Sequence, residues 1–309
     1  MNRSFSDTDD SELSAWLRLC LTPGIGIKEA HNLLTTFGMP EEIFHASYGA
    51  LLKTVPEKLV RLIHGPAPEH ILTQAEKTRA WLQSQGNAIL TLADSRYPKK
   101  LLEIPNPPLM LYVKGRLDLL AANAIAIIGS RNATTQGYLD AQSFAQSLGN
   151  KGLTTISGLS IGIDTAAHEG ALNSPASTIA VIATGADIVY PARNHGLAHK
   201  IADEGLIVSE FPLGTGPEPA NFLRRNRITT GLSDGVLVVE ATLKSGTMAA
   251  ARLAGEQGRD VFAIPGSIHS PLSRGCHALI RQGAKLVETE EDILSELKRK
   301  MPSYSHTAS

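Results

Sequence analysis

The sequence predicts an α/β protein in which a doubly wound, mostly parallel sheet follows a small helical domain. The chain has 309 residues, which is enough for two domains of ordinary size. Near residue 120 the hydrophobic pattern changes from helical periodicity to short β-branched runs that alternate with helical stretches. These runs are apolar at successive positions, as is typical of strands that helices cover on both faces.

The composition excludes several functional classes. The 29 Lys and Arg residues nearly balance the 30 Asp and Glu residues, so a nucleic acid could be bound only through a local basic patch. Cys20 and Cys276 lie far apart in the sequence, which argues against a disulfide framework or a cysteine-based zinc site. The polar, acidic N-terminus lacks a secretory signal, and no apolar run approaches the ~18 residues of a membrane span. We therefore expect a cytoplasmic protein that does not associate with a membrane.

Residues 1–95 are expected to form the helical domain. Apolar periodicity and turn residues predict its helices over 12–20, 30–37, 41–46, 57–64 and 69–85. The prolines between residues 94 and 115 exclude a helix, because proline lacks a backbone N–H and clashes with the preceding turn. We therefore expect an extended connector over 96–120 that contains a short edge strand over 109–114.

Residues 121–300 are expected to form the doubly wound domain, followed by a disordered tail over 301–309. The predicted strands cover 124–128, 153–157, 178–183, 206–209, 236–239, 261–264 and 285–287. The predicted helices cover 135–149, 164–172, 195–203, 222–232, 246–257, 275–282 and 290–300. Strands and helices thus alternate along the chain, as they do in a doubly wound sheet.

Glycine and small hydroxyl residues follow most of the predicted strands. The clearest of these turns are Gly129-Ser130-Arg131, the segment 158–164 and Lys244-Ser245-Gly246-Thr247. Because the carboxyl ends of parallel strands meet at one edge of a sheet, these turns are expected to line one crevice. They let backbone N–H groups approach an anion at a helix N-terminus, so they favour a phosphate-bearing ligand.

The common phosphate-binding fingerprints are absent from these turns. No G-x-G-x-x-G follows the first strand, and the second strand ends in Ser157 rather than in an acidic residue, which disfavours NAD. No G-x-x-x-x-G-K-[ST] follows any strand, which disfavours a P-loop ATPase. The segment 244–247 either holds a phosphate where the next helix begins or is an ordinary N-cap.

A serine hydrolase is one alternative. Segment 158–162 fits G-x-S-x-G, with Ser160 as the nucleophile between a strand and a helix. The partners that would complete the chain order Ser, Asp, His are Asp187 or Asp234 and His269 or His277. No H-G-G-G segment that could form an oxyanion hole lies upstream in the predicted domain, which weakens this alternative.

A basic cluster at 221–227 favours nucleic-acid binding. It comprises Asn221, Phe222, Leu223, Arg224, Arg225, Asn226 and Arg227, with Glu218 as the neighbouring carboxylate in the sequence. Arg131 and Lys244 follow the first and fifth strands and should point into the same crevice. Arginine forks onto phosphate and an exposed phenylalanine stacks on an unpaired base, so this combination suits a single strand better than a duplex.

These segments resemble the DprA family of DNA-processing proteins, also called Smf. The resemblance lies in G-S-R at 129–131, S-G-L-S-I-G-I-D-T-A-A-H at 157–168, R-N-R-I at 225–228, G-L-S at 231–233, V-E-A at 239–241, K-S-G-T at 244–247, G-R-D-V-F-A-I-P-G at 258–266 and G-A-K-L-V at 283–287. It continues into the connector at 97–98, 107–108 and 112–115, and it covers roughly residues 10–297.

The resemblance implies an extended Rossmann-like domain that binds and protects single-stranded DNA taken up during natural transformation and loads the recombinase RecA onto it. It implies a homodimer and a role that is not enzymatic and needs no cofactor, ATP or metal. The implied DNA-binding residues are Gly129, Ser130, Arg131, Gly158, Asn221, Phe222, Arg224, Arg225, Asn226, Arg227, Lys244, Ser245, Gly246 and Thr247. Segment 13–37 resembles a helix-hairpin-helix element, although a plain helix connection fits it equally well.

The chain also departs from the family pattern. Ser160 stands where alanine is usual, Leu223 replaces a usual proline, and no winged-helix segment follows residue 300. A phosphoribohydrolase-like nucleotide-processing enzyme remains a second alternative, although 241–247 reads A-T-L-K-S-G-T rather than the P-G-G-x-G-T of that group. We expect the homodimer to form through residues 275–287, because an uncovered sheet edge beside apolar side chains favours association.

Overall fold

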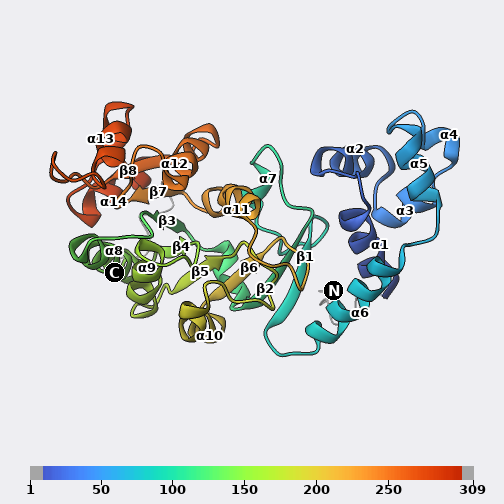
Figure 1. The fold of residues 1–309 in the computed structure, drawn as a ribbon, viewed down its shortest axis with the longest axis horizontal. Coiled ribbons are helices and arrows are strands. Elements are labelled where there is room, and N and C mark those ends of the chain that lie inside the picture. Colours follow the sequence, from blue (N-terminus) through green and yellow to red (C-terminus); the bar gives the residue numbers. More distant parts are fainter. Residues whose placement is uncertain (1–9, 301–309) are drawn as a thin grey trace. The chain divides into compact units, whose positions relative to one another are not determined.

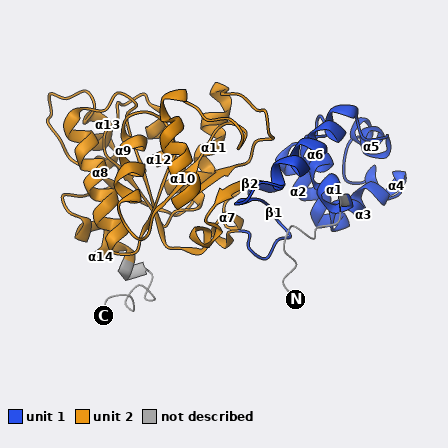
Figure 2. Ribbon diagram, turned by 90° about the horizontal axis from the view of Figure 1, so that it is seen from below, with its two compact units in different colours: residues 1–97, 106–112 blue, residues 98–105, 113–309 orange. Residues whose placement is uncertain are grey.

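The structure, a computed structural model, describes residues 10–300 and divides the chain into two compact units (Figure 1 and Figure 2). One unit comprises residues 1–97 and 106–112, and the other comprises residues 98–105 and 113–309. Residues 96–120, which the sequence predicts to be a connector, contribute to both units. The predicted disordered tail at 301–309 lies outside the described residues.

The first unit is built mainly of short helices. They are α1 (Asp10–Leu21), α2 (Ile27–Phe37), α3 (Pro40–His45), α4 (Tyr48–Leu51), α5 (Glu57–His64) and α6 (Glu69–Leu82). Their apolar faces bury Trp16, Leu33, Ile43 and Ile63 almost completely. The turn between α1 and α2 needs a glycine, because Gly24 has a φ of 86°. The predicted helical region at the N-terminus is confirmed.

Three short elements differ from the prediction. β1 (Asn87–Thr91) is a strand within the region that is predicted to be helical. α7 (Lys99–Leu102) is one helical turn within the predicted extended stretch, and it ends before the prolines that would prevent a longer helix. β2 (Met110–Gly115) is not the predicted edge strand, because β1 lies beyond it in the sheet.

The sheet has the strand order β1-β2-β6-β5-β4-β3-β7-β8-β9, and every neighbouring pair from β6 to β9 is parallel. These strands are β3 (Ala124–Ile128), β4 (Thr154–Ser157), β5 (Thr178–Val181), β6 (Leu206–Ser209), β7 (Gly235–Val238), β8 (Asp260–Ala263) and β9 (Lys285–Leu286). The predicted doubly wound, mostly parallel sheet is therefore confirmed, with strand bounds that differ by a residue or two.

Helices cover both faces of the parallel strands. They are α8 (Thr135–Asn150), α9 (Ile163–Leu172), α10 (His195–Glu204), α11 (Pro219–Gly231), α12 (Gly246–Glu256), α13 (Arg274–Arg281) and α14 (Glu290–Lys300). In Figure 1, α8 and α9 lie along one side of the strands and α11 and α12 along the other. Ile125 and Ile127 of β3 belong to the buried cluster that includes Ala141 of α8 and Ala166 of α9. Burial on both faces explains why the strand sequences are apolar at successive positions.

The strand order reverses direction at β3. The chain proceeds from β3 through β4 and β5 to β6, and then returns to β7, which pairs with the other side of β3. The crevice outside the carboxyl ends of the strands at such a reversal is the usual ligand site of an open α/β sheet. None of the helices within residues 10–300 is long and apolar enough to cross a membrane.

Candidate nucleic-acid interface

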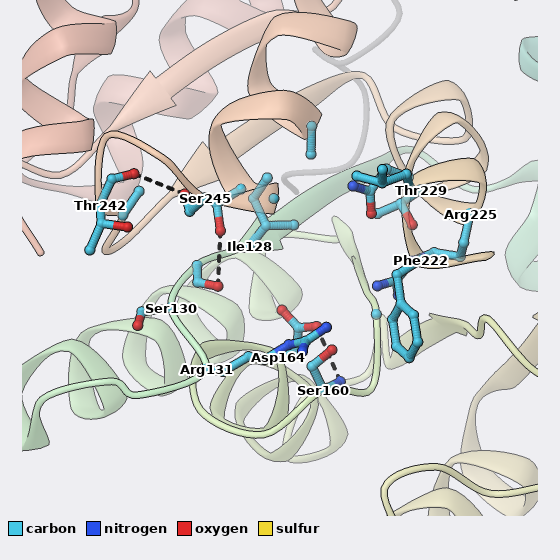
Figure 3. Close-up of a pocket in the computed structure, with 18 of the residues that line it drawn as sticks. Ile128, Ser130, Arg131, Ser160, Asp164, Phe222, Arg225, Thr229, Thr242 and Ser245 are labelled. Carbon is cyan, nitrogen blue, oxygen red and sulfur yellow. Dashed lines mark hydrogen bonds between the residues drawn. The ribbon is translucent and has the colours of Figure 1, made fainter. Parts of the chain in front are cut away.

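A pocket of about 640 Å³ opens at this reversal point (Figure 3). Its walls come from the turns after β3, β4 and β7, from the loop after β5, and from α11 and α12. The lining residues used below are Gly129, Ser130, Arg131, Gly158, Ser160, Asp164, Tyr190, Phe222, Arg225, Asn226, Thr229, Thr242, Ser245, Gly246 and Thr247. Segments that lie more than a hundred residues apart in the sequence thus form one site.

The beginning of α12 forms one wall of the pocket. The side chain of Ser245 caps this helix, because its Oγ accepts a hydrogen bond from the Met248 N–H at 3.4 Å. The same hydroxyl donates to the Thr242 carbonyl at 2.9 Å, and the Thr247 hydroxyl donates to the Gly129 carbonyl at 3.1 Å. The first N–H groups of a helix have no acceptor within the helix, so this wall presents a partial positive charge suited to an anion.

Helix α11 forms the opposite wall and carries Phe222, Arg225, Asn226 and Thr229 (Figure 3). It begins at Pro219, earlier than the predicted start at residue 222, because proline is well suited to the first turn of a helix. Phe222 therefore lies in the first turn. The later residues on the same face of the helix follow at helical spacing and line the pocket with it.

Arg225 is buried, with only 6% of its surface exposed. Its Nη1 donates to the Val181 carbonyl at the end of β5 over 2.6 Å, and a Cβ atom at Gly158 would overlap its guanidinium group. Burial lowers the pKa of Arg225, while the charge of Asp164 acts in the opposite direction. The side chain is thus fixed in the wall of the pocket rather than free to follow a ligand.

Asp164 lies beside Arg225 and is also buried. Its Oδ2 accepts a hydrogen bond from the Ser160 N–H at 3.1 Å. Burial raises the pKa of Asp164, and the charge of Arg225 and the hydrogen bond from Ser160 oppose this increase. The opposite charges of Asp164 and Arg225 largely cancel within the wall. The basic side chain that the lining residues expose to a ligand is therefore that of Arg131.

Arg131 and Phe222 are in contact across the mouth of the pocket. The Cζ atom of Arg131 lies over the Phe222 ring, 5.2 Å from its centroid. Tyr190 approaches the same ring edge-on, with 5.8 Å between the ring centroids. The guanidinium group of Arg131 and the two aromatic rings therefore lie opposite the N-terminus of α12. Together they suit a ligand that carries a phosphate next to a flat ring.

Two arginines of the basic cluster do not line this pocket. Arg224 contacts Oε1 of Glu210 at 2.5 Å, and Arg227 forms an ion pair with Oε2 of the same carboxylate. In the sequence, Glu218 is the carboxylate next to the cluster, whereas in the structure Glu210 reaches the cluster from the end of β6. Glu240, the carboxylate at the end of β7, accepts hydrogen bonds from Thr134 at the start of α8 and is not the partner of Arg227.

Asn221 and Lys244 also lie outside the residues that line the pocket. Lys244 is exposed in the turn before α12, next to Ser245 of the wall. The remaining predicted residues do line it together, namely Gly129, Ser130, Arg131, Gly158, Phe222, Arg225, Asn226, Ser245, Gly246 and Thr247. Asp164, the last residue of the segment 158–164 that was expected to line the crevice, also lines the pocket. The prediction missed Tyr190 and Thr229 as pocket residues.

Three of the residues considered for a serine hydrolase, Asp187, Asp234 and His277, are held in other contacts. Asp234 precedes β7 and therefore lies at the amino ends of the strands, away from the pocket at their carboxyl ends. There it pairs with Lys100 at 2.7 Å. Asp187 accepts a hydrogen bond from the Gly214 N–H at 2.9 Å. Nε2 of His277 accepts from the Gly266 N–H at 3.3 Å. These contacts give no support to a triad centred on Ser160.

Comparisons with known proteins agree with this architecture. The family model of DNA recombination-mediator protein A matches residues 88–298. DNA processing protein DprA of Streptococcus pneumoniae is 46% identical over 208 residues, covering 67% of this chain and 73% of the relative. Protein Smf of Synechocystis is 37% identical over 298 residues, covering 93% of this chain and 73% of the relative.

Solved structures are similar as well. The crystal structure of DNA processing protein A from Streptococcus pneumoniae has a TM-score of 0.73 and 35% identity, covering 93% of this chain and 98% of that chain. DNA processing protein A from Helicobacter pylori, which binds single-stranded DNA, has a TM-score of 0.63 and 33% identity, covering 69% of this chain and 96% of that chain. By sequence and by fold, this chain belongs to the DNA recombination-mediator protein A family.

Proposed function

We propose that this protein binds and protects single-stranded DNA in the pocket at the sheet reversal and loads the recombinase RecA onto the bound strand. The observation that carries the proposal is the pairing of two walls across one pocket. The N-terminus of α12 and the turn at Ser130 suit a phosphate, and Phe222 with Arg131 suits the adjacent base. This is the chemistry of one nucleotide unit of a strand.

The position of Phe222 supports a single strand over a duplex. The ring lies in the wall of a pocket, where a base can reach it only when it is unpaired. The sequence similarity to the Helicobacter pylori protein, which binds single-stranded DNA, supports the same ligand class. We propose that the protein acts in the cytoplasm as a homodimer, by binding rather than by catalysis and without a cofactor.

Binding of fluorescent oligonucleotides, followed by anisotropy, tests the proposal. Gly246→Asp places a carboxylate at the start of α12, where a Cβ atom meets no neighbour and where the helix dipole favours negative charge. The variant should therefore fold normally but bind single strands roughly tenfold or more weakly, because the carboxylate repels phosphate. Gly196→Asp is the matched control, since Gly196 lies in the first turn of α10, is equally open and does not line the pocket.

Equal affinity of Gly246→Asp and the parent protein for single strands would contradict the proposal, as would a parent that prefers duplex DNA. The loading step needs a second assay, in which RecA assembles on a strand coated with single-strand-binding protein. The parent and Gly196→Asp should accelerate this assembly, and Gly246→Asp should not. Labelled DNA recovered from each reaction should be uncleaved, since the proposed role includes no catalysis.

A further inference from the structure

Tyr190 lies in the wall of the pocket but is not part of the nucleotide contact proposed above. The residue follows β5, and 45% of its surface is exposed. Its ring meets the Phe222 ring at an angle of 69° with 5.8 Å between centroids. A tyrosine that served only the core would be largely buried, as Tyr112 is.

The loop that carries Tyr190 is fixed on both sides of this residue. The Thr184 hydroxyl donates to the Ile188 carbonyl at 2.7 Å. On the other side, the amide of Asn194 is buried and donates to the Leu159 carbonyl at 2.9 Å and to the Thr165 hydroxyl at 3.0 Å. The exposed ring is thus presented from a held backbone, which lowers the entropy lost when a ligand packs against it.

We propose that Tyr190 is a second base-stacking residue, so that the site takes two neighbouring nucleotides of a single strand, one base on Phe222 and the next on Tyr190. This inference rests on the proposed function and extends it. The guanidinium group of Arg131 lies over Phe222, so in this arrangement it would contact the phosphate that joins the two nucleotides.

The angle between the rings gives the inference a structural consequence. Neighbouring bases in a duplex are parallel, whereas bases stacked on Phe222 and on Tyr190 would be steeply inclined to each other. A strand bound in this way must be unstacked at this step and cannot be paired with a complement. The arrangement would therefore add selectivity for single strands without reading the base sequence.

The test measures the affinity of four tyrosine variants for an unstructured oligonucleotide and for a strand of equal length whose central nucleotides are abasic. Tyr190→Ala should weaken binding of the normal strand roughly tenfold, with an unchanged salt dependence. Tyr190→Phe, which keeps the ring, should rescue binding, and Tyr190→Leu, which keeps apolar volume without a flat ring, should not. Tyr48→Ala, a tyrosine of similar exposure in the first unit, should bind as the parent does.

On the abasic strand, Tyr190→Ala and the parent should bind equally, because no base is present to stack. An equal loss on both strands would overturn the inference, since Tyr190 would then act on the loop or the backbone. Normal binding by Tyr190→Ala and Tyr190→Leu, beside weakened binding by Phe222→Ala, would overturn the inference while leaving the proposed function intact. A parent protein that binds neither strand would overturn both.

Discussion

At the scale of single residues, the surroundings of each arginine determine its role more than its place in the basic cluster. Arg225 is buried, donates to a strand-end carbonyl and lies beside Asp164. Arg131 is exposed and lies over the ring of Phe222 in the pocket wall. The first therefore shapes the pocket, and the second is positioned to neutralise a phosphate. The same type of side chain thus has a structural role at Arg225 and a proposed binding role at Arg131.

Gly158→Ala tests the packing of Arg225. A Cβ atom at this position would overlap the guanidinium group, so Arg225 must move or the turn after β4 must shift. We expect a loss of about 1–3 kcal/mol in the free energy of unfolding, as in other overpacked sites, together with weaker binding of single strands. Gly255→Ala is the matched control, because nothing lies near a Cβ there and alanine favours a helix. Equal stability of Gly158→Ala and the parent in urea titrations would show that Arg225 is not packed as described.

His168 predicts a pH dependence of stability. The ring is fully buried, and its Nδ1–H donates to the Thr178 hydroxyl, which itself donates to the Thr155 carbonyl. Burial lowers the pKa of His168 to about 3, with a smaller contribution from the charge of Arg225. In the unfolded chain His168 binds a proton near its ordinary pKa of ~6.5. The contribution of the neutral, buried ring to the free energy of unfolding is therefore complete above that pH and is lost as the pH falls toward about 3.

The measurement is the difference in unfolding free energy between the parent and His168→Gln at several pH values. The difference should be largest near pH 7.5 and should shrink by up to ~1.4 kcal/mol for each pH unit below 6.5. Circular dichroism during urea unfolding gives both values. A difference that stays constant down to pH 5 would mean that His168 is not held neutral in the folded protein.

At the scale of elements, one buried carboxylate fixes the helix that carries half of the pocket. Glu210 follows β6, its side chain is 2% exposed, and it pairs with Arg224 and Arg227 one turn apart on α11. Residues three apart lie on the same face of a helix, so both can reach one carboxylate. The other face of α11 then presents Phe222 and Arg225 to the pocket. The ion pairs thus orient the helix without contacting the ligand site.

The two ion pairs should differ in their contribution to stability. The side chain of Arg227 is 13% exposed and that of Arg224 is 50% exposed. Removing the more buried partner leaves Glu210 with less compensation, so Arg227→Ala should cost about 3–5 kcal/mol in unfolding free energy. Arg224→Ala should cost about 1 kcal/mol or less, since water screens an exposed pair. Equal losses in urea titrations would indicate that the two arginines share the carboxylate symmetrically.

The elements differ in how well the sequence predicts them, for physical reasons. The parallel strands are apolar on both faces and separated by glycine turns, so the pattern identifies them to within a residue or two. β1 has only five residues and follows a long helix closely, and α7 is a single turn; neither is long enough for periodicity to emerge. The pairing of Arg224 and Arg227 with Glu210 depends on tertiary packing, which spacing along the chain does not reveal.

The residues that line the pocket can also be predicted from the sequence only in part. Residues on the turns after β3 and β4 and at the start of α12 follow from the rule that strand ends meet at one edge. Tyr190 and Thr229 were missed because the first lies well beyond the end of β5 and the second lies deep within a helix. An exposed aromatic residue beyond a parallel strand is the signal that could have found Tyr190.

At the scale of the whole molecule, the position of β3 at the centre of the parallel strands determines where the ligand is bound. β4 pairs with one side of β3 and β7 with the other, so the turns after β3, β4 and β7 diverge and open the crevice. The far edge of the sheet is β9, where Leu286 is 44% exposed. The pocket thus lies at the carboxyl ends of the parallel strands, whereas β9 forms a separate edge of the sheet within the described residues.

Homodimerisation is expected at that edge. An unpaired strand with an exposed leucine favours pairing with a second copy, through residues 275–287. Light scattering at micromolar concentration should give twice the mass of the 309-residue chain, and Leu286→Glu should give the mass of a single chain. A parent that is monomeric under these conditions would exclude the dimer. A dimer that is insensitive to Leu286→Glu would show that the contact lies elsewhere.

If the strand is bound through Arg131, the exposed cation among the lining residues of the pocket, its affinity must depend on salt through this residue. Each phosphate contact contributes about −0.7 to the slope of log affinity against log salt for single strands. Arg131→Ala should therefore make the slope less steep by about 0.7. Arg61→Ala, which removes an exposed charge remote in sequence from the pocket, and Arg227→Ala, which removes a charge already paired with Glu210, should leave it unchanged. Identical slopes for the parent and Arg131→Ala would show that the DNA is bound elsewhere on the protein.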